Sequence, residues 1–173
     1  MFTKTDIERY FVGEKQESFW FLVIGITAVV LALLFFFFLK TNFHKGVAIP
    51  LFVVGIILGA AGYTVYKRSD ADRINNVYAY DMNPMQLKEK ELPRMKTVMK
   101  NFIILRYVEI LLFIVGLVLY IYFIRDIRND FWRGLGLSLA IMALIGLIGD
   151  YIAENRGKTY INGIQSFITK QRL

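Results

Sequence analysis

The chain has 173 residues, of which 56% are apolar and 20% are charged, and its formal net charge is +7. Soluble domains average about 45–50% apolar and about 25% charged residues, whereas here the apolar excess is gathered into four long blocks. These apolar blocks exclude a soluble globule and a disordered chain. Because the chain contains no cysteine, a disulfide-stabilised secreted module is excluded as well.

The four apolar blocks predict four transmembrane helices, because roughly 20 mostly apolar residues cross a bilayer. They comprise residues 19–39, 46–66, about 101–124 and 134 to about 153. The first block is longer than the apolar core of a secretory signal, so we expect it to be retained. None of the blocks shows the alternation of barrel strands. We therefore predict an all-α, polytopic membrane protein with two transmembrane hairpins, 18–66 and 102–153.

Basic residues predict the orientation of these helices, since cytoplasmic segments are enriched in lysine and arginine. Segments 1–17, 67–101 and 154–173 together carry 15 of the 21 basic residues, and the two hairpin loops carry 5. Both termini and the central segment should therefore be cytoplasmic. Two short hairpins are typical of small proteins of the bacterial inner membrane, where we place the chain. Because the basic residues follow topology, nucleic-acid binding is not expected.

The two hairpins show a faint internal similarity. A shift of 87 positions aligns Gly59 with Gly146 and Gly62 with Gly149, and also Ile74-Asn75 with Ile161-Asn162. Such a shift is consistent with a 2+2 parallel repeat about an axis along the membrane normal. Chance matches within apolar sequence explain it equally well, so both interpretations stay open.

The three cytoplasmic segments have amphipathic patterns that predict short helices. A capping-box pattern at Thr5-Asp6-Ile7-Glu8 predicts a helix start in segment 1–17, and Asn83-Pro84 and Pro93 predict two starts in the central segment. Apolar residues in 154–173 repeat the pattern. Such a basic face suits anionic lipid headgroups or a protein partner, although each segment could instead pack on its sister. The residues expected on the central surface are Arg94, Lys96, Lys100, Met95 and Met99.

Three ionisable residues lie within the predicted spans: Arg106, Glu109 and Asp150, which we call the intramembrane charge cluster. An embedded acid should face the bundle interior and find a cation or water. We expect Glu109 to pair with Arg106 on one helix face, and Asp150 to pair with Arg106 across the helices. The cluster is then either a structural ion pair or a proton- or ion-responsive site at Glu109.

Small residues at steps of three and four allow helices to approach closely. The second and fourth spans carry them at Gly55, Gly59, Gly62, Gly146 and Gly149. These contacts could lie within one chain or between copies in a homo-oligomer. Pro50 is expected early in its helix, where a missing amide has little effect.

Groups that support catalysis are scarce in this sequence. The chain has no cysteine, and its one histidine, His44, has no neighbouring ligands, so we expect neither a metal nor a cofactor. Gly157-Lys158-Thr159 lacks the first glycine of a phosphate-binding loop, and Asp70 and Asp72 are more typical of a solvated helix end than of a Mg²⁺ site. We therefore do not expect an enzyme.

These patterns favour a non-enzymatic membrane protein that acts by binding. It would be a subunit or regulator of an envelope complex, or an immunity-type protective factor against a membrane-targeting toxin. The alternative is a homo-oligomeric ion channel or small transporter, with its pathway between subunits and Glu109 and Asp150 as acidic sites.

Overall fold

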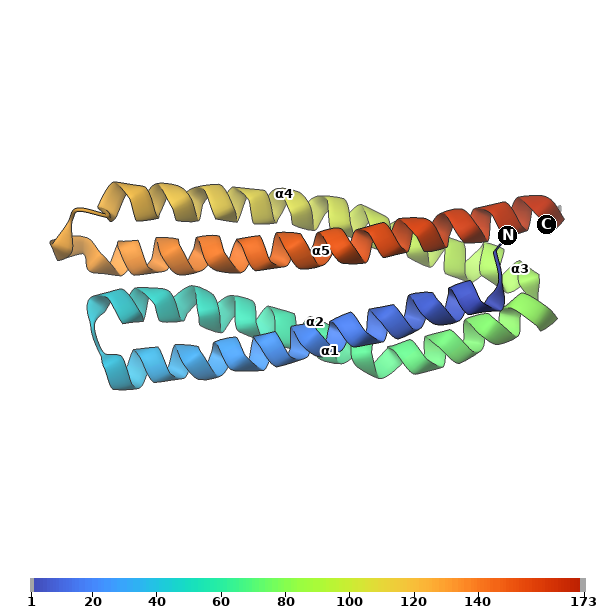
Figure 1. Ribbon diagram of the computed structural model, residues 1–173, viewed down its shortest axis with the longest axis horizontal. Coiled ribbons are helices and arrows are strands. Elements are labelled where there is room, and N and C mark those ends of the chain that lie inside the picture. Colours follow the sequence, from blue (N-terminus) through green and yellow to red (C-terminus); the bar gives the residue numbers. More distant parts are fainter. Residues whose placement is uncertain (1, 172–173) are drawn as a thin grey trace.

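The computed structural model describes residues 2–171 and is 95% helical. The elements follow one another with few intervening residues (Figure 1). They are α1 (Lys4–Leu34), the π-helix η1 (Phe35–Leu39), α2 (Asn42–Met82), α3 (Pro84–Gln86), the π-helix η2 (Leu87–Glu91), α4 (Leu92–Phe123), the 3-10 helix η3 (Ile127–Asn129) and α5 (Asp130–Gln171).

Four of these helices are long and apolar enough to cross a membrane, which confirms the predicted number of candidate spans. Each is much longer than a bilayer requires. At 1.5 Å per residue, the 41 residues of α2 and the 42 residues of α5 extend for roughly 60 Å, about twice the hydrocarbon thickness. The boundaries predicted at residues 17, 66, 101 and 153 therefore fall inside continuous helices.

Side chains at the helix starts account for some of the ends. Thr3 precedes α1, and its backbone N–H and hydroxyl both donate to the Asp6 carboxylate at 2.8 Å. The helix cap is therefore Thr3, two residues before Thr5, so the predicted position of the capping box at Thr5-Glu8 was wrong. Thr41 caps α2 by accepting a hydrogen bond from the backbone N–H of His44 at 3.2 Å. Between these two helices the chain turns at Lys40, which has a left-handed φ of 54°.

The three prolines lie at different places in their helices. Pro50, expected early in its helix, lies two turns inside α2, because that helix already begins at Asn42. Pro93 lies in the first turn of α4, which begins at Leu92, so the predicted start there is confirmed, and the π-helix η2 leads into it without a break. The start predicted at Asn83-Pro84 coincides with that of α3.

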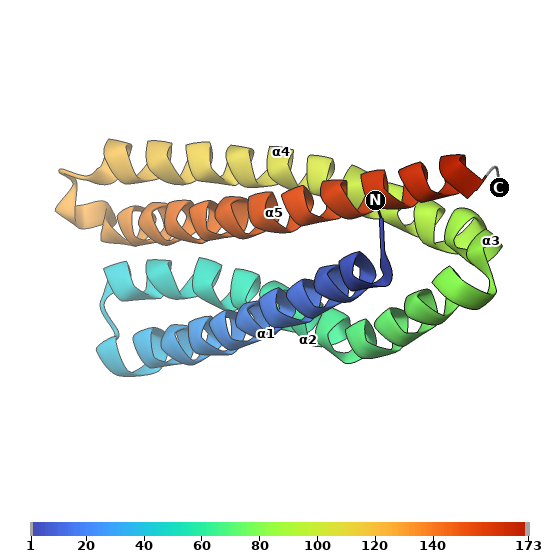
Figure 2. The same cartoon turned by 45° about the vertical axis from the view of Figure 1, so that its right-hand side comes forward.

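The long helices lie side by side in the order α1, α2, α5, α4. The most extensive contacts join α1 to α2, then α4 to α5, and α2 to α5, whereas α4 has its main contacts with α5 and η2. Both termini lie at the end of the molecule that carries α3, and the α1–α2 and α4–α5 connections lie at the other end (Figure 1). The turned view keeps the same neighbours together (Figure 2).

The two ends of the molecule are packed in opposite ways. We call residues 18–66 and 102–153 the span half, and residues 2–17, 67–101 and 154–171 the terminal half. In the span half the buried positions are mostly small, whereas large apolar side chains such as Phe38, Ile57 and Leu111 are 61–78% exposed. The buried small residues include Gly25, Ala28, Ala32, Gly55, Gly62, Ala140 and Ala143.

The terminal half instead has a core of large side chains. The central cluster includes Phe11, Met95 and Ile164, each no more than 1% exposed. Tyr10 and Tyr160 stack face to face, with ring centroids 4.0 Å apart. Burial of both rings raises the pKa of Tyr10 and of Tyr160 above the ordinary value of 10, and the Glu14 carboxylate adds to the shift of Tyr10. Large apolar side chains are buried together in this way when the surrounding solvent is water.

Candidate functional site

The richest group of polar side chains lies where the two halves meet. Here the helices carry acidic and basic residues on their facing sides, one or two turns beyond the apolar runs. α1 contributes Glu14 and Glu17, α2 contributes Arg68 and Ser69, α4 contributes Arg106, and α5 contributes Glu154, Arg156 and Lys158. Sequence reasoning identified only Arg106 among these residues.

Arg106 does not have the partner that we predicted. Its guanidinium pairs with the Glu154 carboxylate on α5, and that carboxylate also pairs with Lys158 at 2.8 Å. Among the described residues it forms no ion pair with Glu109 or Asp150, so the predicted pairing was wrong. The reason is directional: Glu154 lies one helical turn nearer the terminal half than Asp150, and a long arginine side chain extends toward the polar end of its helix.

Glu154 is only 4% exposed, yet the sequence analysis placed it outside the fourth span. The spacing of Glu154 from its charged neighbours could have indicated that it belongs with them on one helix face. Asp150, Glu154 and Lys158 follow one another at steps of four, which puts all three on one face of α5.

The other two residues of the intramembrane charge cluster, Glu109 and Asp150, have fewer polar partners than Arg106. The Glu109 side chain lies against Gly146 of α5, where a Cβ would come 3.2 Å from its carboxyl carbon. One carboxylate oxygen, Oε2, is buried and has no hydrogen-bond partner within residues 2–171. Asp150 is half-buried and forms no ion pair in the same described range. Gly146 therefore makes room for an acidic side chain in the span half.

A second acid is held by three neighbours at the boundary. Glu14 is 8% exposed, and it accepts hydrogen bonds from the Tyr10 hydroxyl at 3.3 Å and from the Ser69 hydroxyl at 3.2 Å. Arg68 lies 3.7 Å from the same carboxylate. The sequence patterns did not single out Glu14, although Tyr10, Glu14 and Ser18 recur at steps of four on one face of α1 and are all buried.

A cavity of about 230 Å³ opens beside these groups, and we call it the boundary cavity. All four long helices line it, because α4 packs mainly on α5 and leaves space opposite α1 and α2. Its polar lining includes Tyr10, Glu14, Glu17, Arg68 and Arg156, and its apolar lining includes Phe21, Ala61, Val65, Phe102, Leu105 and Ala153. A water molecule occupies about 30 Å³ in the liquid, so this space is large enough for a small ligand group.

Three polar atoms that belong to the lining residues lack a partner. Glu17 pairs with Arg156 through Oε1, but Glu17 Oε2, Arg156 Nε and Arg68 Nε are buried and accept or donate no hydrogen bond within the described part of the chain. Buried polar groups are normally satisfied. The three atoms have almost no accessible surface, but they belong to charged side chains that line the boundary cavity, and these side chains make it a candidate ligand site.

The expected surface of the central segment is largely occupied by the protein itself. Met95 is fully buried, and Met99 packs against Gly157 of α5, so neither forms an exposed face. Arg94 makes two hydrogen bonds to Glu91, at 2.7 and 2.8 Å. Only Lys96 and Lys100 are exposed. The alternative in which each amphipathic segment packs on its sister describes what the structure shows.

The glycines of the second span lie at contacts within the chain. A Cβ at Gly62 would lie 2.6 Å from the Leu22 nitrogen, and one at Gly55 would lie 3.0 Å from the Gly25 oxygen. Gly59 is more open, with its nearest such neighbour at 3.9 Å. On α5, Gly149 accommodates the ring of Phe21, in addition to the Glu109 contact at Gly146.

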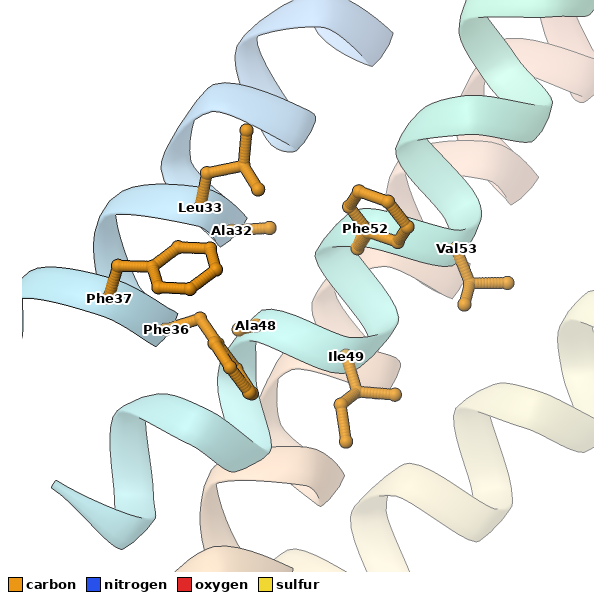
Figure 3. A pocket seen from close by; sticks show the side chains of 8 residues that line it. All are labelled: Ala32, Leu33, Phe36, Phe37, Ala48, Ile49, Phe52 and Val53. Carbon is orange, nitrogen blue, oxygen red and sulfur yellow. The ribbon is translucent and has the colours of Figure 1, made fainter. Parts of the chain in front are cut away.

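A separate pocket lies far from the charged groups, near the α1–α2 connection. Its volume is about 240 Å³ and its lining is apolar. Figure 3 shows Phe36 and Phe37 of η1 facing Ala48 and Phe52 of α2 across it. With no polar group in its lining to fix an orientation, this pocket offers less specificity than the boundary cavity.

Comparison with known proteins gives no further guide to the site. No protein-family model, curated protein or solved structure matches this chain. The residues that could hold a metal ion do not gather either: in residues 2–171 there is no group of three or more metal-ligating side chains.

Proposed function

We propose that the chain is an integral membrane protein whose span half lies in the bilayer and whose terminal half lies in the cytoplasm. The opposite packing of the two halves supports this location. Large apolar side chains face outward in the span half, where lipid would cover them, and inward in the terminal half, where water would surround it. The excess of basic residues in the terminal half supports a cytoplasmic side, and the two short hairpins are the reason for proposing a bacterial inner membrane.

Single introduced cysteines test this topology directly, because the chain has none of its own. An impermeant thiol reagent applied to intact cells should label His44→Cys in the α1–α2 connection and spare Thr169→Cys near the end of α5. Both should react after the cells are opened. Labelling of Thr169→Cys alone in intact cells would show the opposite orientation.

Within the membrane, the protein acts by binding a partner and not by catalysis. The supporting observation is the poor coverage of α4. Only 6% of its most apolar stretch is buried, against 33% for α5, and it packs chiefly on one neighbour. A helix that is held on one side leaves an apolar face for another transmembrane helix. The partner is a component of an envelope complex that this chain completes or regulates, or a toxin that it neutralises.

Photo-crosslinking distinguishes a protein partner from lipid on this face. A photoreactive amino acid at position 111 or 118, both exposed on α4, should give an adduct with the mass of a second protein. The matched control is position 148, an equally exposed apolar site on α5. The proposal fails if all three positions yield only lipid adducts in native membranes.

Transport through a homo-oligomer is the second candidate, and one observation favours it. Glu109 Oε2 is buried and unpartnered among the described residues, as a residue that exchanges a proton or an ion would be. Reconstitution into liposomes should then give a proton or ion flux that Glu109→Gln abolishes. Under the binding proposal the same preparation shows no flux above that of empty liposomes.

A further inference from the structure

The boundary cavity has an ordered polarity along the helix axes. On α1, α2 and α5 its charged residues belong to the terminal side and its apolar residues to the span side: on α1 the lining runs from Tyr10 and Glu14 to Phe21, and on α2 from Arg68 to Ala61. The lining residues of α4 are all apolar. From Tyr10 to Phe21 the distance is roughly 16 Å at 1.5 Å per residue. The polar end therefore lies at the level of the lipid headgroups if the span half lies in the bilayer.

The charges of the cavity cancel. Its charged lining consists of two carboxylates, Glu14 and Glu17, and two guanidinium groups, Arg68 and Arg156. Glu14 already has two hydrogen-bond donors, whereas Glu17 Oε2 still lacks one. The Arg68 guanidinium lies 3.7 and 3.9 Å from its carboxylate partners, beyond normal hydrogen-bond length.

A matching ligand must therefore offer an acceptor to two arginines and a donor to one glutamate, and must be neutral overall. We propose that the boundary cavity binds one molecule of a zwitterionic phospholipid with a primary ammonium group, of the phosphatidylethanolamine type. Its phosphate lies at Arg68 and Arg156, its ammonium group lies at Glu17, and an acyl chain follows the apolar lining past Phe102 and Leu105. This inference rests on the proposed membrane location.

Other abundant lipids satisfy the site less well. A phosphatidylglycerol headgroup adds a negative charge that nothing in the cavity balances, and it brings no cation to Glu17. A phosphatidylcholine headgroup has no N–H group, so it cannot donate a hydrogen bond to the Glu17 carboxylate. Since a tenfold preference corresponds to the strength of a single good hydrogen bond, we expect phosphatidylethanolamine to bind about tenfold more tightly than either.

Native mass spectrometry of the delipidated full chain in mild detergent tests the proposal. Titration with phosphatidylethanolamine should give one dominant adduct per chain, and the same titration with phosphatidylglycerol or phosphatidylcholine should give weaker, non-stoichiometric adducts. Soluble glycerophosphoethanolamine should not displace the lipid at equal concentration. Equal binding of the three lipids, no bound lipid, or displacement by the soluble headgroup would each overturn the assignment.

Substitutions then locate the site. Arg68→Gln should reduce phosphatidylethanolamine affinity about tenfold, while Lys67→Gln, which removes the adjacent exposed charge from the same helix, should leave it unchanged. Glu17→Gln leaves the cavity with one excess positive charge, so its preference should move toward phosphatidylglycerol. A residue with only a structural role would not reverse the order of the lipids.

A second pair of variants leaves every charge in place. Ala61→Phe fills the apolar end of the cavity and should abolish the stoichiometric adduct. Ala60→Phe changes an exposed neighbour that does not line the cavity and should retain the adduct. If both variants bind lipid alike, the cavity is not the site. The cysteine-labelling experiment is independent of these titrations: failure there removes the membrane location, whereas failure of the titrations alone removes only the lipid.

Discussion

The pairing of Arg106 with Glu154 can be tested against the pairing that the sequence suggests. The perturbation is Glu154→Gln, which keeps the shape of the side chain and removes its charge. Glu154 is 4% exposed and contacts both Arg106 and Lys158. Loss of one partner of a fully buried ion pair typically costs 3–5 kcal/mol.

Two features of the structure reduce that figure. The Arg106 side chain is 42% exposed and Lys158 is 56% exposed, so neither cation becomes fully buried and unpaired. We therefore expect Glu154→Gln to lower the free energy of unfolding by about 2 kcal/mol. For a chain of this length such a loss corresponds to a decrease in Tm of roughly 4–8 °C, measured by circular dichroism in detergent.

A double-mutant cycle identifies the partner, because residues in contact show coupling energies of about 0.5–3 kcal/mol and distant residues do not. The cycle of Arg106→Met with Glu154→Gln should give a coupling of at least about 1 kcal/mol. The cycle of Arg106→Met with Glu109→Gln should give a value near zero. A larger coupling with Glu109 than with Glu154 would refute the assignment.

Three further predictions concern packing and pH. Ile164→Ala removes a fully buried core side chain and should lower the free energy of unfolding by about 2–5 kcal/mol. In thermal melts the control variant Ile152→Ala, at a 53% exposed position, should change this free energy little. Equal effects of the two variants would contradict the described core. Gly62→Ala brings a methyl group to 2.6 Å from the α1 backbone and should reduce Tm by several degrees, while Gly59→Ala, with 3.9 Å available, should be tolerated. The terminal half should lose helical signal as the pH rises above about 10, because the raised pKa of Tyr10 keeps its hydroxyl protonated in the folded state while the unfolded state releases the proton. Tyr10→Phe should reduce this alkaline loss, and an unchanged pH profile would argue against burial of that hydroxyl.

Composition was sufficient to predict the number and approximate position of the apolar helices, because a span of this length has few alternatives. It was not sufficient to predict what the amphipathic segments face. A stripe such as Leu92, Met95 and Met99 has the same spacing whether lipid or a neighbouring helix covers it. In the structure α5 covers it, and only the relative placement of two distant segments decides this.

The candidate site was harder to predict than the helices. Glu109 and Asp150 stood out because they interrupt apolar runs, whereas Glu14 and Glu154 lie just beyond such runs and look like ordinary flanking charges. Their burial depends on four helices continuing past the apolar blocks as one bundle. The boundary cavity depends in addition on α4 lying apart from α1 and α2, which no local pattern encodes.

The unbroken course of α2 has a mechanical consequence. Gly62, where α2 closely approaches the α1 backbone, is 20 residues from Asn42 and 20 residues from Met82. The two arms of the helix on either side of this contact are therefore equal, roughly 30 Å each. A tilt of about 5° about the contact would shift both tips by roughly 3 Å in opposite directions, so a displacement of the membrane end would be accompanied by one of similar size at the terminal end.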